Sequence, residues 1–308
     1  MPVIYSPDYD CPEATTLLST RKQAVVFDLI HASDLAKGCS FLEGEPATAD
    51  QLQLIHTRKY VEAFLAGTPR GLAQSQRFDW SPKFARSVLA VNGGHLLACR
   101  QALQNGLSFH LASGAHHARA ECGSDFCTFN YLAWCPKFMM QEGEIERTLI
   151  VDLDTHQGDG NWLLTRDDPR FRCFDISGCS MDVPPHHVAD GDYWLIGKDR
   201  FSARYFEALK RLPCIIDDFK PDLIQFQAGM DCYEKDPMMD GNGGLTAEEL
   251  ARRDRFVIES CRERRLPLVV NLAGGYCDMK TTAKLHFQTF LICLASISGS
   301  PNMESLKN

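Results

Sequence analysis

The chain has 308 residues, of which 44% are hydrophobic, and its formal net charge is −8. This acidic balance argues against a protein that binds nucleic acid through phosphate contacts, because no run of Lys and Arg offsets it. Thirteen cysteines, without a secretory leader or an apolar run long enough to span a bilayer, indicate a reducing compartment. We therefore expect a cytoplasmic protein with no membrane span and no disulfide framework.

Strand-like apolar runs alternate with helical stretches along the chain. The strand-like runs lie near Val3, Phe109, Leu149, Phe171, Leu223 and Leu268. The clearest helical stretches cover residues 83–104 and 246–264. This order predicts an α/β fold of three layers, with a central parallel sheet flanked by helices. Since no Pro/Gly/Ser linker interrupts the pattern, we expect a single domain over residues 1–296 and a polar tail over 297–308.

Two adjacent histidines, His116 and His117, follow the strand-like run at 107–112. Adjacent imidazoles suit proton transfer, although a histidine pair by itself is more often structural or exposed. Carboxylates behind the two rings would fix their tautomers and raise their basicity. The pair therefore depends on acids supplied by another part of the chain.

The densest group of polar side chains follows the apolar run at 148–151, and it contains Asp152, Asp154, His156 and Asp159. In an extended segment alternate side chains share a face, so Asp152, Asp154 and His156 are expected to point the same way. Two carboxylates this close repel each other unless a cation lies between them. A carboxylate combined with an imidazole favours Zn²⁺, with Fe²⁺ as the alternative. The competing interpretation is a solvated acidic turn.

A third metal ligand is predicted after the buried strand at 222–229, where Asp231 follows. Open α/β sheets bind their ligands at the carboxyl ends of strands. A catalytic zinc site needs three protein ligands and one open position. Taken alone, an aspartate here would more often cap a helix or a turn.

A short buried strand at 266–270 leads into the glycine pair Gly274-Gly275 and then Tyr276. Two glycines allow a tight turn and a close approach of backbone. The phenol of Tyr276 could then donate a hydrogen bond to a developing oxyanion at the metal. The alternative for Tyr276 by itself is an ordinary core tyrosine.

Five motifs in this order resemble the zinc-dependent histone deacetylases of the arginase/deacetylase superfamily. They are Gly114-Ala115-His116-His117, Phe126-Cys127, the segment 152–160, Ala228-Gly229-Met230-Asp231 and Gly274-Gly275-Tyr276. The residue pattern of the third motif is most similar to that of the class IV branch and its bacterial relatives. The resemblance covers nearly the whole chain and implies an arginase/deacetylase-like fold.

The resemblance also implies which residues bind metal ions. The three zinc ligands would be Asp154, His156 and Asp231. A K⁺ ion near the zinc would be held largely by backbone oxygens of Asp152, Asp154, His156, Ser177 and Gly178.

Catalytic roles follow from the same resemblance. His117, backed by Asp159, would act as general base and then as general acid. His116, backed by Asp152, would be its electrostatic partner. Tyr276 would polarise the scissile carbonyl.

The expected substrate channel includes Phe126 and Cys127, preceded by Asp125 where relatives usually have glycine. A carboxylate on the channel wall would favour a cationic substrate, whereas an outward-turned Asp125 would only cap a local turn. The loop at 179–193 departs from the family pattern and is expected to shape the entrance. Its His186 and His187 are expected to be solvated and to play no part in the site.

Three functions remain open from the sequence. The first is removal of acetyl or longer acyl groups from lysine side chains of a peptide or protein by metal-activated water. The second is an amidohydrolase for acetylated polyamines, which would need a narrow acidic channel. The third is an inactive acyl-lysine-binding module, against which the intact ligands, histidines and tyrosine argue.

Overall fold

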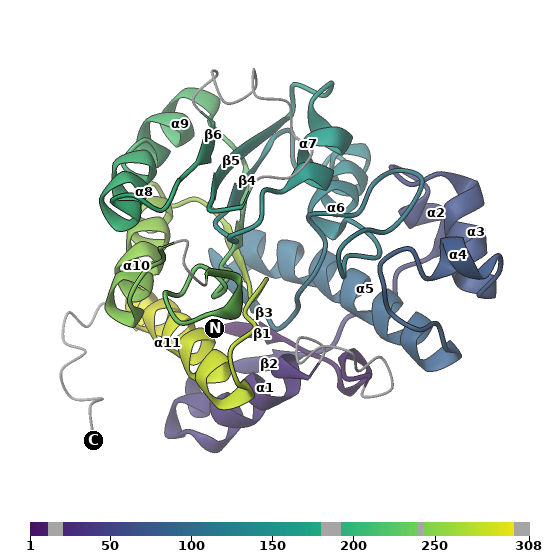
Figure 1. The fold of residues 1–308 in the computed structure, drawn as a ribbon, viewed down its shortest axis with the longest axis horizontal. Helices are drawn as coiled ribbons and strands as arrows, with labels where there is room; N and C mark the ends of the chain where they lie inside the picture. Colours follow the sequence, from purple (N-terminus) through teal and green to yellow (C-terminus); the bar gives the residue numbers. More distant parts are fainter. Residues whose placement is uncertain (12–20, 180–191, 240–242, 299–308) are drawn as a thin grey trace.

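An eight-stranded sheet runs through the centre of the molecule (Figure 1). The computed structural model describes residues 1–11, 21–179, 192–239 and 243–298. Within them the strands are β1 (Pro2–Ile4), β2 (Ser40–Leu42), β3 (Leu107–His110), β4 (Thr148–Asp152), β5 (Phe171–Ser177), β6 (Tyr193–Leu195), β7 (Leu223–Gln227) and β8 (Leu268–Asn271). The strand order is β2-β1-β3-β8-β7-β4-β5-β6, and every neighbouring pair is parallel. This confirms the predicted α/β class.

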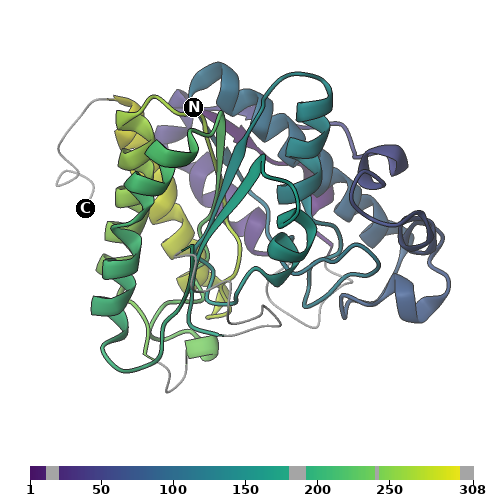
Figure 2. The same cartoon turned by 90° about the horizontal axis from the view of Figure 1, so that it is seen from above.

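Helices cover both faces of the sheet (Figure 2). One face carries α1 (Lys22–Ala32), α8 (Phe201–Leu209), α9 (Leu212–Phe219), α10 (Ala247–Glu263) and α11 (Met279–Ser298). The other carries α5 (Pro82–Asn105), α6 (Tyr131–Gln141) and α7 (Asp159–Thr165). The short helices α2 (Ala49–Leu52), α3 (Arg58–Ala66) and α4 (Arg70–Ala73) lie farther out (Figure 1). Single 3₁₀ turns cover Pro7–Tyr9, Asp34–Gly38 and Pro237–Met239.

The strands are apolar on both faces because both faces are covered. In β4, Leu149 and Val151 join the core beneath α8 to α11, whereas Ile150 joins the core beneath α5 and α6. Successive side chains of a strand point to opposite faces, so one short apolar run contributes to two separate cores. In β8, likewise, Leu268 and Val270 join the first core and Val269 joins the second.

The two predicted helical stretches are confirmed as α5 and α10, and local capping explains their ends. Ser81 accepts a hydrogen bond from the third helical residue of α5, Pro82 occupies the first position, and Gly106 closes the helix with φ of 80°. Thr246 and Glu249 form a reciprocal capping box at the start of α10.

Register places the polar loops at one edge of the sheet. At the carboxyl end of β4, Asp152 lies beside Gln227 of β7 and Asp175 of β5, and Gln227 lies beside Asn271 of β8. Because all the strands are parallel, the loops that follow β3, β4, β7 and β8 meet at this edge. These loops contain the residues singled out in the sequence.

The expected division of the chain at residue 296 stays a prediction, and α11 continues to Ser298. Residues 299–308 of the tail and 180–191 of the entrance loop, including His186 and His187, lie outside the described residues. All 13 cysteines lie in the described residues, and none of them forms a disulfide. No helix in the described part of the chain has the length and apolar character needed to cross a bilayer.

Candidate active site

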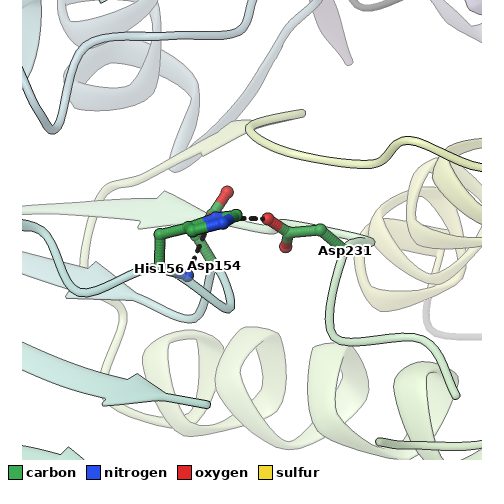
Figure 3. A group of neighbouring side chains, drawn as sticks. All are labelled: Asp154, His156 and Asp231. Carbon is green, nitrogen blue, oxygen red and sulfur yellow. Dashed lines mark hydrogen bonds and ion pairs between the residues drawn. The ribbon is translucent and has the colours of Figure 1, made fainter. Parts of the chain in front are cut away.

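Two carboxylates and one imidazole meet at the carboxyl ends of β4 and β7 (Figure 3). Asp154, His156 and Asp231 each offer a ligand atom within 4.8 Å of the other two. Nδ1 of His156 lies 3.1 Å from Oδ1 of Asp154 and 3.1 Å from Oδ2 of Asp231. The carboxylates are buried, but the His156 side chain is 21% exposed. One side of the group therefore remains accessible.

The expected alternation through His156 was wrong, because β4 ends at Asp152. The chain turns there, and the backbone N–H of His156 donates to Oδ1 of Asp154 over 3.0 Å. The side chain of Asp152 is directed instead to His116. A local turn, rather than one face of a strand, brings Asp154 and His156 together.

The chemistry of this group fits a divalent cation. Burial and the charge of Asp154 raise the pKa of Asp231 to about 7. Burial lowers the pKa of His156, but hydrogen bonds to both carboxylates outweigh it and raise the pKa to about 11. Without an ion, an imidazolium is thus the charge that balances two buried acids. One nitrogen and two carboxylate ligands match zinc or ferrous iron better than calcium or magnesium.

The pair Gly274-Gly275 explains how the loop after β8 can approach the carboxylates. The backbone N–H of Gly274 donates to Oδ2 of Asp154 over 2.8 Å. A Cβ at Gly274 would collide with the carboxylate oxygens of both Asp154 and Asp231. Gly275 has φ of 139°, which L side chains rarely adopt. Glycine is therefore required at position 274, because any larger residue there would displace the carboxylates of Asp154 and Asp231.

Each of the two histidines has its own acid partner, as the sequence analysis predicted. Nδ1 of His116 donates to Asp152 over 2.9 Å, and Nδ1 of His117 donates to Asp159 over 2.6 Å. The two ring centroids lie 4.0 Å apart, and Nε2 of His116 is 3.9 Å from Asp154. Each aspartate therefore holds its ring through Nδ1, so Nε2 does not contact that aspartate.

The two imidazoles have opposite pKa shifts. Burial lowers the pKa of His116, but the charges of Asp152 and Asp154 outweigh burial and raise it well above its ordinary value. Burial and the neighbouring His116 lower the pKa of His117, despite Asp159. Near neutral pH, His117 is the ring available to accept a proton.

Tyr276 lies on the loop after β8, and its ring centroid is 6.3 Å from that of His156. Asp236 fixes this loop, because one of its carboxylate oxygens accepts from the backbone N–H groups of Tyr276 and Cys277 over 2.7 and 3.1 Å. Burial and the charges of Asp154 and Asp231 raise the pKa of Tyr276 well above 10. The phenol therefore keeps its proton and can donate it in a hydrogen bond.

A cavity of about 90 Å³ borders this group. His116, Asp154 and Tyr276 line it, and so do the expected channel residues Phe126 and Cys127. The Cys127 thiol accepts a hydrogen bond from the backbone of Ala115 over 3.0 Å, and burial raises its pKa. Cys127 is therefore a wall residue rather than a nucleophile.

Asp125 combines the two alternatives left open by the sequence. It lines the cavity, and it also accepts a hydrogen bond from Ser124 within the local turn, over 2.8 Å. Its other oxygen pairs with Nη2 of Arg77 at 2.7 Å. Arg77 also lies over the ring of Phe126, 6.0 Å from its centroid. The carboxylate is thus at the wall, and a cation balances its charge.

Lys22 is a site residue that the sequence analysis missed. It lines the same cavity, is only 1% exposed, and donates from Nζ to the carbonyl of Ala273. Burial lowers its pKa to about 8, against the attraction of Asp231 and Asp154. A lone lysine in an N-terminal helix carries no signal of this position, because its hydrogen-bond partner Ala273 lies 251 residues away.

The segments named for K⁺ lie side by side. Backbone N–H groups of Gly178 and Cys179 donate to the carbonyl of Thr155 over 2.9 and 2.8 Å, and His156 pairs with Cys179 in an isolated bridge. Ser177, the last residue of β5, is buried next to them. This adjacency is what a shared backbone site requires, and the K⁺ assignment stays a prediction.

The fold and this group of acids and imidazoles define an α/β protein with an enzyme-like site at the carboxyl edge of a parallel sheet. A family model described as histone deacetylase domain matches residues 16–290. The chain belongs to the histone deacetylase family. Membership identifies a hydrolase with deacetylase activity toward an acetylated substrate.

Three relatives illustrate the breadth of the likeness. An uncharacterized protein of Picosynechococcus sp. is 34% identical over 89% of this chain and 92% of its own. Histone deacetylase 2 of Arabidopsis thaliana is 25% identical, over 92% of this chain and 76% of the relative's length. Acetoin utilization protein AcuC of Staphylococcus aureus is 28% identical, over 80% of this chain and 68% of the relative's length. The bacterial resemblance is thus confirmed, and the class IV assignment stays a prediction.

Proposed function

We propose that this protein is a zinc-dependent lysine deacylase that hydrolyses acetyl or longer acyl groups from lysine side chains of peptides or proteins. The observation that carries the proposal is the pair of His–Asp contacts beside the Asp154–His156–Asp231 group. This arrangement brings metal ligands and proton-transfer groups together, and Asp154, His116 and Tyr276 line one cavity beside them. The products would be a free amine and a carboxylate.

The metal ligands would be Asp154, His156 and Asp231. The chemistry that zinc supplies in such a site is a lowered pKa of bound water, to about 7, and polarisation of the acyl carbonyl. The His156 side chain is 21% exposed, so a water molecule and the acyl carbonyl could both reach this site. Fe²⁺ could occupy the same ligands.

His117 would take the proton from the attacking water at its free Nε2, because its lowered pKa keeps the ring neutral. Asp159 holds Nδ1 and stabilises the imidazolium that forms. The same ring then protonates the leaving amine. Asp159 thereby sets the tautomer that makes both steps possible.

His116 would remain protonated through the cycle, since Asp152 and Asp154 raise its pKa. A fixed positive charge there stabilises negative charge that develops on the substrate. Tyr276 would donate a hydrogen bond from its hydroxyl group to the same developing oxyanion. The side chains of His116 and Tyr276 are both positioned before the substrate binds.

A lysine substrate is favoured over an acetylated polyamine by the charge at the cavity wall. A polyamine carries a second ammonium group, which an unpaired carboxylate would attract. Apart from the proposed metal ligand Asp154, the acid that lines the cavity is Asp125, and Arg77 already balances its charge. An acyl-lysine held in a peptide needs no such attraction, so the paired wall suits it better.

Two further predictions accompany this proposal. A K⁺ ion would lie among backbone oxygens of the adjoining segments that contain Asp152, Asp154, His156, Ser177 and Gly178. We also place the protein in the cytoplasm and expect no nucleic-acid partner, on the composition and charge of the chain.

The test is hydrolysis of three matched substrates by zinc-loaded protein: an acetyl-lysine peptide, a long-chain acyl-lysine peptide and acetylputrescine. Turnover of either peptide supports a lysine deacylase and reports the acyl length. Turnover of acetylputrescine alone would assign the protein to polyamine hydrolysis. No turnover of any substrate, with binding of an acyl-lysine peptide retained, would favour the inactive binding module.

A further inference from the structure

One buried guanidinium connects the two loops that carry the proposed metal ligands. Arg253 lies on α10, and its side chain is 0% exposed. Its Nη1 donates to the carbonyl of Gly229 over 2.7 Å and to the carbonyl of Leu153 over 3.2 Å. Leu153 immediately precedes Asp154, and Gly229 lies two residues before Asp231. A single side chain thus bridges the loop after β4 and the loop after β7.

The guanidinium is itself held in place. Nε and Nη2 of Arg253 both lie 2.7 Å from Oδ1 of Asp254. The second oxygen of Asp254 accepts from the hydroxyl of Thr289 on α11 over 2.6 Å. Sγ of Cys232, next to Asp231, lies 3.0 Å from Nη1. Helices α10 and α11 therefore fix the position from which Arg253 reaches the two loops.

A buried ion pair is a costly way to fill this space. Well-packed apolar side chains of similar volume often replace a buried ion pair without loss of stability. The carbonyls of Leu153 and Gly229 would, however, keep only the weak Cys232 thiol as a donor, over 3.8 and 3.5 Å, and an under-satisfied buried carbonyl is unfavourable. What the arginine supplies beyond packing is one nitrogen, Nη1, that donates to both loops, on a planar guanidinium whose Nε and Nη2 lie against Asp254.

We propose that Arg253 is a positioning residue for the metal centre: it sets the separation between the loop with Asp154 and His156 and the loop with Asp231. The inference rests on the proposed metal site. Tight metal binding requires ligands held at fixed distances, and groups that orient ligands typically contribute 10- to 100-fold to affinity. Loss of the bridge allows the two loops to separate, so ion affinity falls.

A purely electrostatic effect would have the opposite sign. A guanidinium near a cation site repels the ion, so removing its charge would tighten binding. A purely structural effect would lower stability and leave the affinity of the folded protein unchanged. Ion affinity therefore separates the three roles.

The experiment compares zinc affinity, measured by competition with a chromophoric chelator, in the wild type, Arg253→Met and Arg253→Lys. Arg252→Met is the matched control, because Arg252 lies on the same helix and stacks on Phe206 with its guanidinium 3.4 Å from the ring centroid. We expect zinc binding weaker by about 10- to 100-fold in Arg253→Met. Arg252→Met should bind as the wild type does.

Arg253→Lys keeps the charge but cannot donate to both carbonyls in the same geometry, so its affinity should fall as well. Circular dichroism checks that each variant is folded, and Arg253→Lys decides the question if Arg253→Met does not fold. Unchanged or tighter zinc binding by a folded Arg253 variant would overturn the inference. Failure of the metal site itself is distinguishable, because the wild type would then bind zinc no better than His156→Ala.

Discussion

Nδ1 of His117 lies 2.6 Å from Oδ1 of Asp159, and the other oxygen of that carboxylate accepts a hydrogen bond from Arg119 over 2.8 Å. Asp159 is thus shared between an imidazole and a guanidinium. The corresponding acid behind His116, Asp152, accepts instead from the neutral amide of Asn161 over 3.0 Å. The two His–Asp pairs therefore have different charge environments, in keeping with the opposite pKa shifts of their rings.

This difference predicts the pH dependence of turnover. Because burial and the neighbouring His116 lower the pKa of His117 from 6.5, the acidic limb of kcat/KM should lie below pH 6.5. Asp159→Asn removes a charge that raises this pKa, so the acidic limb should move to lower pH while the rate decreases. A pH profile of kcat/KM for both proteins checks this, and a limb that moves to higher pH would contradict it.

Tyr276→Phe should lower kcat by about 10²- to 10³-fold, because it removes one hydrogen-bond donor to the oxyanion. The aromatic ring is retained, so folding and zinc affinity should not change. Steady-state kinetics on an acyl-lysine peptide, together with a zinc titration, separate the two effects. Unchanged turnover would remove Tyr276 from the mechanism.

Zinc should stabilise the protein against thermal unfolding, since an ion that binds only the folded state adds about 2.7 kcal/mol at 100 times its Kd. The melting temperature of ion-stripped wild type should therefore rise by several degrees when zinc is added. His156→Ala should lose this response. An equal rise in His156→Ala would show that zinc binds at another place.

Arg77→Met should increase the preference for acetylputrescine over a neutral acetyl-lysine peptide, because the charge of Asp125 is then unbalanced. An exposed ion pair contributes about 0–1 kcal/mol, so the ratio of kcat/KM values should change by about fivefold or less. The double variant Arg77→Met/Asp125→Asn should restore the wild-type ratio. A ratio insensitive to both changes would remove this pair from substrate selection.

The sequence was sufficient to predict most of the sheet, because buried parallel strands are short continuous apolar runs. Thr148–Asp152 and Leu223–Gln227 lie where such runs occur. The strands at Ser40–Leu42 and Tyr193–Leu195 were missed. Each has only three residues and forms an edge of the sheet, so neither shows a full apolar period.

The site was predicted in part, because its motifs combine several chemical groups within a few residues. The contacts that were missed join distant parts of the chain and have no local pattern. In the sequence, nothing near Arg77 indicates its ion pair with Asp125, which the fold brings next to it. Arg253 likewise has the sequence context of an ordinary charged residue on an amphipathic helix. The turn after Asp152 was also missed, since an extended segment was assumed to continue through His156.

The most direct test of the central claim is acetate release from an acetyl-lysine peptide by ion-stripped protein, measured as zinc is added in steps up to one equivalent. We predict no turnover without the ion, a rise in rate that ends at one zinc per chain, and no recovery in His156→Ala. Hydrolysis by the stripped protein at the full rate, or equal recovery in His156→Ala, would contradict a zinc-dependent deacylase built on Asp154, His156 and Asp231.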